Sequence, residues 1–486
     1  MTQLRQRPGF DVPTDLLIGG DWRPGGRPDR LPVYDPATEE PIAHIADADP
    51  ADGIAAVDAA AAALPGWAAT SPRARSEVLM RAFTLMTERR EQLAELIVIE
   101  NGKALPDARG EVAYAAEFFR WYAEEAVRAG GHVSTAPGGS NKILVLRQPI
   151  GVSVLVTPWN FPAAMATRKI GPALAAGCTV VLKPATETPL TAFAIAALLA
   201  EAGVPPGVVN VVTTSTAGPV VAAMVDDPRV RKLSFTGSTE VGRRLLATAA
   251  KTVVSCSMEL GGNAPFLVLA DADLGAAVDG AMVAKMRNGG EACTSANRFY
   301  VHASVAPEFS ARLSAAMAAL KVGPGLDAGV QVGPLVNAPS REKVQELVRA
   351  AVEGGARVLT GAGAPDRRGF FYDPTVLADV PADAAILREE IFGPVAPLVT
   401  FEDIDDAVRM ANDTEYGLVS YVYTTNLAVG LAVSERLDAG MVGLNRGVVS
   451  DPAAPFGGTK QSGVGREGGH EGMLEYLESK YIAVSW

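Results

Sequence analysis

Residues 150–260 alternate short apolar runs with helix-like stretches, and this alternation restricts the fold more than any other feature of the chain. The apolar runs are, in order, GVSVLVTP, CTVVLKP, VVNVV, VRKLSFTG and VVSCSME. A helix is expected over residues 188–202, between the second and third runs, and Gly203 would end it. Strands that alternate with helices form βαβ units, so this segment predicts a parallel sheet with a Rossmann-like core.

Two further segments extend the α/β pattern. Residues 265–445 form a second alternating series, which predicts another α/β domain. Residues 50–128 carry apolar positions at helical spacing and predict several long helices, and a short strand is expected over residues 16–22. The chain is therefore expected to be an α/β protein with two Rossmann-like domains.

The charge balance and the apolar pattern exclude several classes of partner. The 486 residues include 43 Lys and Arg against 55 Asp and Glu, a net charge of −12, which argues against binding to nucleic acid or to anionic membranes. No stretch reaches the roughly 18–20 apolar residues that span a bilayer, and the start MTQLRQRPGF has no apolar signal core. A soluble cytoplasmic protein is expected.

Cysteine and histidine are few and scattered. The residues are Cys178, Cys256, Cys293, His44, His132, His302 and His470. None has the spacing of a metal site, so neither a metal nor a structural disulfide is expected. Cys178 and Cys256 lie in apolar surroundings typical of inert core thiols, whereas Cys293 lies in a glycine-rich polar run.

Three motifs together indicate covalent catalysis at a carbonyl. Cys293, in RNGGEACTSANR, offers a thiolate nucleophile, and Glu259, in MELGG, offers a base that could activate water. Asn160, in TPWNFP, follows an expected strand, where its amide could donate to an oxyanion. Each residue alone has an ordinary explanation: a buried cysteine, a solvated glutamate, a turn asparagine. The combination favours the catalytic interpretation.

The motif order closely resembles that of the aldehyde dehydrogenase superfamily over nearly the whole chain. The motifs are TPWNFP, FTGSTEVG, MELGG, the cysteine run, EEIFGPV and PFGGTKQSGVGREG. The resemblance implies a thiohemiacetal on Cys293, hydride transfer to a nicotinamide, and a thioester hydrolysed by water that Glu259 activates. It also implies an oxyanion hole formed by Asn160 and the backbone N–H of Cys293.

The resemblance divides the chain into functional parts. Residues 1–130 and 150–260 would form the cofactor-binding domain, and residues 261–445 the catalytic domain that carries the nucleophile. Residues 131–149 and 470–486 would be oligomerisation strands of a homodimer or homotetramer. In this family the first of these segments, which contains KILVLRQP, is expected to pair with the C-terminal strand, about residues 480–486, across the dimer interface.

The chain has no GxGxxG fingerprint between an expected strand and a helix, so the cofactor site is expected elsewhere. In FTGSTEVG, Gly237 and Ser238 separate a strand from a helix that would start at Ser238 or Thr239, which offers free N–H groups to a pyrophosphate. An ordinary helix cap is the alternative. The resemblance adds contacts by other residues. These are Thr157, Pro158, Trp159, Leu260, Glu390 as a ligand of the nicotinamide ribose, and Phe392 near the ring.

The KPATETP run bears on the choice between NADP and NAD. Lys183 could contact the adenosine ribose or its phosphate, and Thr186 stands where strictly NAD-using relatives often have a glutamate that repels a 2′-phosphate. These two residues favour NADP slightly. Glu187 could restore some of the repulsion, so use of NAD stays open.

Arg168, Arg287 and Ser450 indicate a substrate with a distal carboxylate, which arginine binds in bidentate fashion. The three resemble the succinate semialdehyde dehydrogenases within the superfamily. Ordinary salt bridges are the alternative for each arginine. Glutarate semialdehyde, a broad range of aldehydes, or a non-catalytic binding role are the alternative functions.

Three positions depart from the family pattern. Glu291 replaces a common glutamine two residues before the nucleophile, and it is expected to face away from the thiol or to find a cationic partner. Ser295 stands where some relatives have a second cysteine, so an active-site disulfide is not expected. Arg446 is either a third cation at the substrate mouth or a surface residue.

Overall fold

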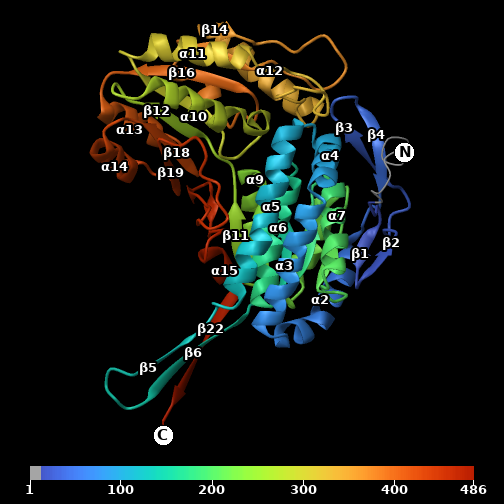
Figure 1. Ribbon diagram of the computed structural model, residues 1–486. Coiled ribbons are helices and arrows are strands. Elements are labelled where there is room, and N and C mark those ends of the chain that lie inside the picture. Colours follow the sequence, from blue (N-terminus) through green and yellow to red (C-terminus); the bar gives the residue numbers. More distant parts are fainter. Residues whose placement is uncertain (1–11, 486) are drawn as a thin grey trace.

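An eight-stranded sheet is the centre of the first α/β unit (Figure 1). The computed structural model describes residues 12–485, and the calls on residues 1–11 and 486 lie outside it. The sheet order is β2-β1-β9-β8-β7-β10-β11-β21, with parallel pairing from β9 to β11. Its strands are β1 (Leu16–Ile18), β2 (Asp21–Arg23), β7 (Val152–Val156), β8 (Thr179–Lys183), β9 (Val209–Val211), β10 (Val230–Thr236), β11 (Ser255–Glu259) and β21 (Gly463–Val464).

Helices cover both faces of this sheet, as parallel strands require. On β8, Val180 and Leu182 pack with the helices of one face, while Val181 packs with those of the other. The first face carries α3 (Pro72–Glu88), α4 (Arg90–Asn101), α5 (Leu105–Ala126), α6 (Pro162–Ala176) and α7 (Pro189–Glu201). The second carries α2 (Pro50–Ala69), α8 (Ala217–Asp226) and α9 (Thr239–Ala249).

The second unit is built around a seven-stranded sheet, which lies above the first in Figure 1. Its order is β14-β15-β16-β13-β12-β18-β19, parallel except for the pair of β14 with β15. The strands are β12 (Ala264–Val268), β13 (Ala296–His302), β14 (Arg357–Thr360), β15 (Thr375–Ala378), β16 (Val395–Phe401), β18 (Val419–Tyr423) and β19 (Met441–Leu444). Its helices are α10 (Leu274–Met286), α11 (Ala306–Ala318), α12 (Ala338–Glu353), α13 (Ile404–Asn412) and α14 (Leu427–Arg436), with short 3₁₀ turns η1 (Arg287–Gly290) and η2 (Ala385–Leu387).

The predicted parallel sheet and the helix before Gly203 are both present. α7 ends two residues before Gly203, which has φ +96° and so adopts the left-handed conformation that glycine favours. The strand expected over residues 16–22 is instead the hairpin of β1 and β2. The chain turns at Gly19 and Gly20, with φ +69° and +97°.

A three-stranded arm projects from the two units and holds the C-terminal strand (Figure 1). It contains β5 (His132–Thr135), β6 (Lys142–Pro149) and β22 (Leu477–Val484). The expected pairing across a dimer interface is wrong, because β22 pairs with β6 of the same chain along eight residues. Residues 470–476 also differ from the prediction, since α15 (Glu471–Leu474) packs on α6 rather than in the arm.

The segment between the second unit and the arm returns to the first unit. Within it, β21 adds an antiparallel edge strand to β11, and β20 (Thr459–Lys460) pairs with β17 (Tyr416–Gly417). A short hairpin of β3 (Leu31–Asp35) and β4 (Glu40–Ile45) lies near the N-terminus. None of the described helices is both long enough and apolar enough to cross a membrane.

Candidate active site

A cavity of about 280 Å³ lies where the carboxyl ends of the first sheet meet the second unit. This edge is the usual ligand site of an open α/β sheet. The predicted residues in its lining are Pro158, Trp159, Asn160, Arg168, Gly237, Ser238, Leu260, Arg287, Cys293, Glu390, Phe392 and Ser450. These residues come from at least five separate segments, so the fold joins most of the motifs at one place.

The loop that carries Cys293 has a backbone that depends on its NGG sequence. Asn288, Gly289 and Gly290 have φ of +54°, +60° and +82°. A side chain at Gly290 would meet the carbonyl oxygen of Gly393 at 2.2 Å. Burial raises the pKa of the Cys293 thiol to about 12, and Arg168 and Arg287 oppose that shift. The resting nucleophile is therefore a thiol beside two cations.

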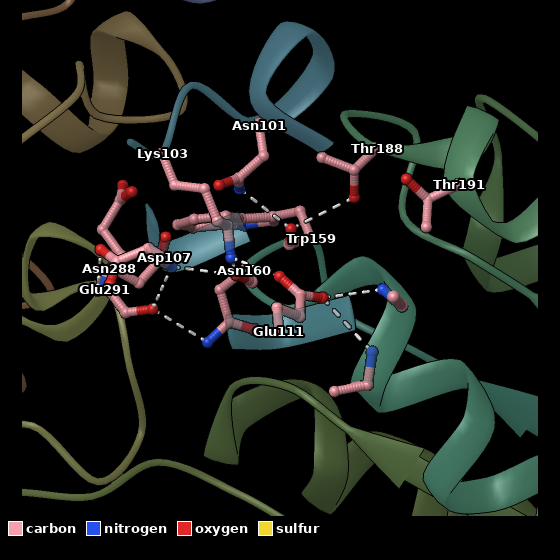
Figure 2. Close-up of polar contacts among 12 residues, drawn as sticks. Asn101, Lys103, Asp107, Glu111, Trp159, Asn160, Thr188, Thr191, Asn288 and Glu291 are labelled. Carbon is pink, nitrogen blue, oxygen red and sulfur yellow. Dashed lines mark hydrogen bonds and ion pairs between the residues drawn. The ribbon is translucent and has the colours of Figure 1, made fainter. Parts of the chain in front are cut away.

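Asn160 follows β7 by four residues, and its amide points to the cysteine loop (Figure 2). Its Nδ2 donates a hydrogen bond of 3.0 Å to the carbonyl oxygen of Glu291, two residues before Cys293. An amide nitrogen carries two N–H groups. The second one remains for an oxyanion at a carbon bound to Cys293.

Glu259 ends β11, and its buried carboxyl is not part of the cavity lining. Burial raises its pKa well above the usual range, and the Glu467 carboxylate raises it further. Burial opposes ionisation of Glu467 as well, but Arg168 and Lys169 lower the pKa of that carboxyl. We therefore assign the proton of this pair to Glu259 and the negative charge to Glu467.

Arg168 lines the cavity but is already paired. Its Nε lies 2.5 Å from Oε2 of Glu467, with both side chains buried. Burial alone would lower its pKa, but the Glu467 carboxylate raises it. The guanidinium also stacks on the ring of Phe456 at 4.3 Å. The salt-bridge alternative is thus present for Arg168, although part of its guanidinium remains at the cavity.

Arg287 is held by a hydroxyl and by aromatic rings, whereas Arg168 is held by a carboxylate and an aromatic ring. Its Nη1 donates to Oγ of Ser450 at 3.1 Å, and its guanidinium lies over the ring of Phe161 at 4.8 Å. Among residues 12–485, no carboxylate forms an ion pair with it. Arg287 and Ser450 therefore present a charged donor and a hydroxyl from two distant segments to one side of the cavity.

A second group of cavity residues has the chemistry to bind parts of a dinucleotide. Ser238 is the N-cap of α9 and accepts from the N–H of Val241 at 3.4 Å, so the helix start faces the cavity as predicted. The rings of Trp159 and Phe392 meet edge to face at 5.3 Å. Glu390 accepts from the N–H of Gly262 at 3.1 Å, and burial raises its pKa to about 7. The helix start suits a phosphate, and the aromatic pair suits a flat ring.

Three residues predicted for the cofactor do not line this cavity. The N–H of Thr157 donates to the carbonyl oxygen of Lys183, which joins the ends of β7 and β8. Lys183 is buried, and burial lowers its pKa. Thr186 and Glu187 line a separate cavity of about 400 Å³. Thr157 nonetheless follows β7, Lys183 ends β8, and Thr186 and Glu187 follow β8, so all of them lie at the same edge of the sheet.

Two of the departures from the family pattern are now placed. Oε1 of Glu291 accepts from the N–H of Val336 at 3.1 Å, and burial raises the pKa of this carboxyl to about 8. Arg446 is exposed, and its Nε donates to the carbonyl oxygen of Val448. Arg446 is not in the cavity lining.

Sequence reasoning missed three residues around the site. Phe456 and Glu467 lie within the recognised PFGGTKQSGVGREG motif, so the motif itself could have drawn attention to them. Tyr114 lines the cavity from the middle of α5. No local pattern distinguishes Tyr114 from the other buried aromatic residues of that helix, and only the packing of α5 on α6 brings it there.

Sequence comparisons agree with this geometry. The profile described as "Aldehyde dehydrogenase family" matches residues 22–482. Succinate-semialdehyde dehydrogenase of Paenarthrobacter nicotinovorans is 55% identical, over 91% of this chain and 99% of the relative. Succinate-semialdehyde dehydrogenase [NADP(+)] GabD of Escherichia coli (strain K12) is 48% identical, over 96% and 97%. Glutarate-semialdehyde dehydrogenase of Pseudomonas putida is also 48% identical, over 96% and 97%.

A solved structure shows that the likeness extends to the whole fold. The crystal structure of succinate-semialdehyde dehydrogenase from Burkholderia pseudomallei superposes with a TM-score of 0.96. The two chains are 45% identical, and the match covers 98% of each. The two sheets and the arm are therefore similar to those of a known enzyme.

Proposed function

Since this chain belongs to the aldehyde dehydrogenase family, we propose that it oxidises succinate semialdehyde to succinate with NADP or NAD. The observation that carries the substrate assignment is Arg287, a cavity cation without a carboxylate partner among the described residues, hydrogen-bonded to Ser450. A substrate carboxylate would supply the partner. Arg168, on the same cavity, adds a second positive charge.

In the proposed reaction, Cys293 gives its thiol proton to solvent water, and the Sγ thiolate attacks the aldehyde carbon to form the oxyanion of a thiohemiacetal. Nδ2 of Asn160 and the backbone N–H of Cys293 donate to the oxyanion. A bound nicotinamide supplies the acceptor for the hydride that leaves this carbon. Water then hydrolyses the thioester. In this step Glu259 acts as the base after it has lost its own proton to solvent and its side chain has turned into the cavity.

The cofactor is proposed to be NADP in preference to NAD. Thr186 carries no charge that would repel a 2′-phosphate, and Lys183 lies at the end of the neighbouring strand. The relative from Escherichia coli is named as an NADP(+) enzyme. Glu187, beside Thr186, carries a charge that would repel a 2′-phosphate, so NAD remains the alternative cofactor.

Glutarate semialdehyde is the second candidate substrate, because a relative with that name is as similar as the one from Escherichia coli. It is one methylene longer. A methylene contributes only about 1–3 kcal/mol of discrimination. Both substrates are therefore expected to react, with the four-carbon aldehyde preferred.

The arm is proposed to mediate a homodimer or homotetramer, because it projects from the two units and exposes apolar side chains such as Val133 and Tyr481. A cytoplasmic location stays a prediction.

The test is kcat/KM for succinate semialdehyde, glutarate semialdehyde, propanal and benzaldehyde, each with NADP and with NAD. We expect a preference of a hundredfold or more for the four-carbon semialdehyde over propanal. A flat profile, or one led by an uncharged aldehyde, would contradict the substrate and leave the family chemistry standing.

Arg287→Ala is the sharper variant for assigning the carboxylate site, since Arg168→Ala would also unpair the buried Glu467. A hydrogen bond to a charged group contributes about 1.5–3 kcal/mol, so KM for succinate semialdehyde should rise about 10- to 100-fold while that for propanal stays constant. Arg109→Ala, at an exposed arginine paired with Glu91, is the matched control. Equal losses for both aldehydes would make Arg287 structural.

A further inference from the structure

Residues 157–161, which carry Asn160, form a loop in which side chains, rather than a strand or helix, bind the backbone carbonyls of Trp159 and Asn160 (Figure 2). The carbonyl oxygen of Trp159 accepts from Nδ2 of Asn101 at 3.1 Å and from Oγ1 of Thr188 at 3.2 Å. The carbonyl oxygen of Asn160 accepts from Nζ of Lys103 at 2.7 Å and from Nδ2 of Asn288 at 2.9 Å. Four side chains from three separate segments therefore fix two successive peptides.

Lys103 is the charged member of this set. Its Nζ also lies 2.6 Å from Oε2 of Glu111, and both side chains are fully buried. The ammonium group lies 4.2 Å from the centre of the Phe161 ring. Removing a lysine from water is costly unless its hydrogen bonds are satisfied. This lysine therefore has an ordered position, and a carboxylate and the Asn160 peptide determine it.

Glu111 extends the same anchor to the next helix. Its Oε1 accepts from the N–H groups of Ala163 at 2.8 Å and Ala164 at 3.3 Å, in the first turn of α6. The N-cap residue of α6, Phe161, makes no side-chain capping bond. Glu111 thus caps α6 from α5 and fixes the chain on the C-terminal side of Asn160.

Asn288 ties this anchor to the cysteine loop. Its Nδ2 donates to the carbonyl oxygens of both Asn160 and Glu291, and its own N–H donates to Asp107 at 3.0 Å. The side chain of Asn160 donates to that same Glu291 carbonyl. The oxyanion donor and the loop of the nucleophile are therefore held by one network.

We propose that Lys103 is a positioning residue, which acts through the Asn160 peptide to aim the Asn160 amide at the oxyanion on the carbon bound to Cys293. The inference rests on the proposed role of Asn160 in aldehyde oxidation. Lys103 is not in the cavity lining and so contacts neither substrate nor cofactor there. Its loss should therefore lower kcat with little effect on either KM, because an interaction made only in the transition state is lost.

The experiment is a double-mutant cycle of Lys103→Met and Asn160→Ala, assayed with succinate semialdehyde and with propanal. Lys103→Met should lower kcat at least tenfold and change the KM values of aldehyde and cofactor less than threefold. In the Asn160→Ala background the same substitution should lower kcat less than threefold, because the donor it positions is absent. Lys232→Met is the matched control, since Lys232 is an equally buried lysine paired with Glu475 and has no contact with Asn160.

The outcomes separate this inference from the proposed function. If Asn160→Ala lowers kcat strongly, and the two substitutions lower kcat by independent factors that multiply in the double variant, the inference is contradicted and the proposed function is not. An unchanged kcat in Asn160→Ala contradicts both the oxyanion role and the inference. If Lys103→Met does not fold, the double variant Lys103→Met/Glu111→Gln replaces it, because it removes both charges of the pair. Its kcat is then compared with that of Glu111→Gln. A kcat for that double variant equal to that of Glu111→Gln would overturn the proposal.

Discussion

At the scale of single residues, the thiol of Cys293 lies among charges of both signs. Burial raises its pKa most, Arg168 and Arg287 lower it, and the Glu390 carboxylate raises it. Because burial prevails, the free protein holds the nucleophile as a thiol. Formation of the thiolate then depends on a change at the site, such as substrate entry or loss of a nearby negative charge.

The first prediction concerns alkylation of Cys293 by iodoacetamide. With a pKa near 12, the thiolate fraction should rise about tenfold per pH unit from pH 7 to 10, and the rate should follow it. Peptide mass spectrometry would follow the rate, with Cys293→Ser as the control. A plateau below pH 9 would contradict the buried-thiol assignment.

The second prediction concerns the buried carboxyl of Glu291. Its folded pKa, about 8, lies above the usual 4.5, so its contribution to stability is complete below about pH 4.5 and is lost as pH rises toward 8. The loss approaches roughly 1.4 kcal/mol per pH unit. Glu291→Gln removes this dependence, so its melting temperature should rise relative to the natural protein from pH 5 to pH 8.

Glu88→Gln, at an exposed carboxyl, is the control for that comparison. A melting-temperature difference that is constant across pH 5 to 8 would mean that Glu291 is ionised in the folded protein. The measurement is differential scanning fluorimetry of the three proteins in matched buffers.

Motif residues could be assigned from the sequence, whereas their tertiary partners could not. Cys293, Asn160 and Arg287 stand in runs whose residue types suggest a role, and all three line the cavity. Glu467 lies within a recognised motif, but its contact with Lys169, 298 positions away, could not be predicted, and Lys103, outside every motif, contacts Asn160 across 57 positions. Such contacts leave no local pattern.

At the scale of elements, α9 approaches the cavity through a glycine. A side chain at Gly242 would meet Cδ2 of Leu260 at 2.4 Å, and Leu260 lines the cavity. The close approach of the helix to the end of β11 therefore requires a residue without a side chain at position 242. It sets where the start of α9 lies relative to the cavity.

The third prediction compares two helical glycines. Gly242→Ala should push Leu260 into the cavity, raise KM for the cofactor about tenfold and destabilise the protein by about 1–3 kcal/mol. Gly110→Ala, in α5, has no atom within 4 Å of the new side chain and should stabilise by about 0.5–1 kcal/mol with unchanged kinetics. Kinetics and thermal melting check both. An unchanged cofactor KM in Gly242→Ala would contradict the packing argument.

Elements with a clear period were predictable, and very short ones were not. The five apolar runs each contain a strand of the first sheet, and residues 50–128 hold the four helices α2 to α5. β20 and β21 have two residues each, too few to show a period. They form because β11 and β17 have edges available for pairing, and a short stretch of sequence does not show this.

At the scale of the whole molecule, a row of apolar side chains crosses the three strands of the arm. Val133, Leu144 and Ile482 are aligned across its three strands, and Val133 and Ile482 are 69% and 38% exposed. A row of this kind is a candidate interface between copies of the chain. The C-terminal strand contributes to it directly.

The fourth prediction is that Val133→Lys/Ile482→Lys shifts the chain toward the monomer. The charges would oppose burial of the row at an interface, while β6 and β22 would still pair by their backbones. Light scattering after size-exclusion chromatography gives the mass. Leu427→Lys, at a leucine 64% exposed on α14, is the control. An unchanged mass in the arm variant would remove the row from the interface.

The closing strand of the first sheet is made long after the strand that it pairs with. Ser462, next to β21, bonds to Gly261 across 201 positions, and β22 follows β21 among the described strands. At roughly 5–20 residues per second, a ribosome needs about 10–40 s to make the intervening stretch. During that interval the edge of β11 that β21 later covers stays open, and the edge of β6 stays open for longer, because β22 follows β21 in the chain. Open strand edges can pair with other chains, so the nascent chain needs protection at these two edges.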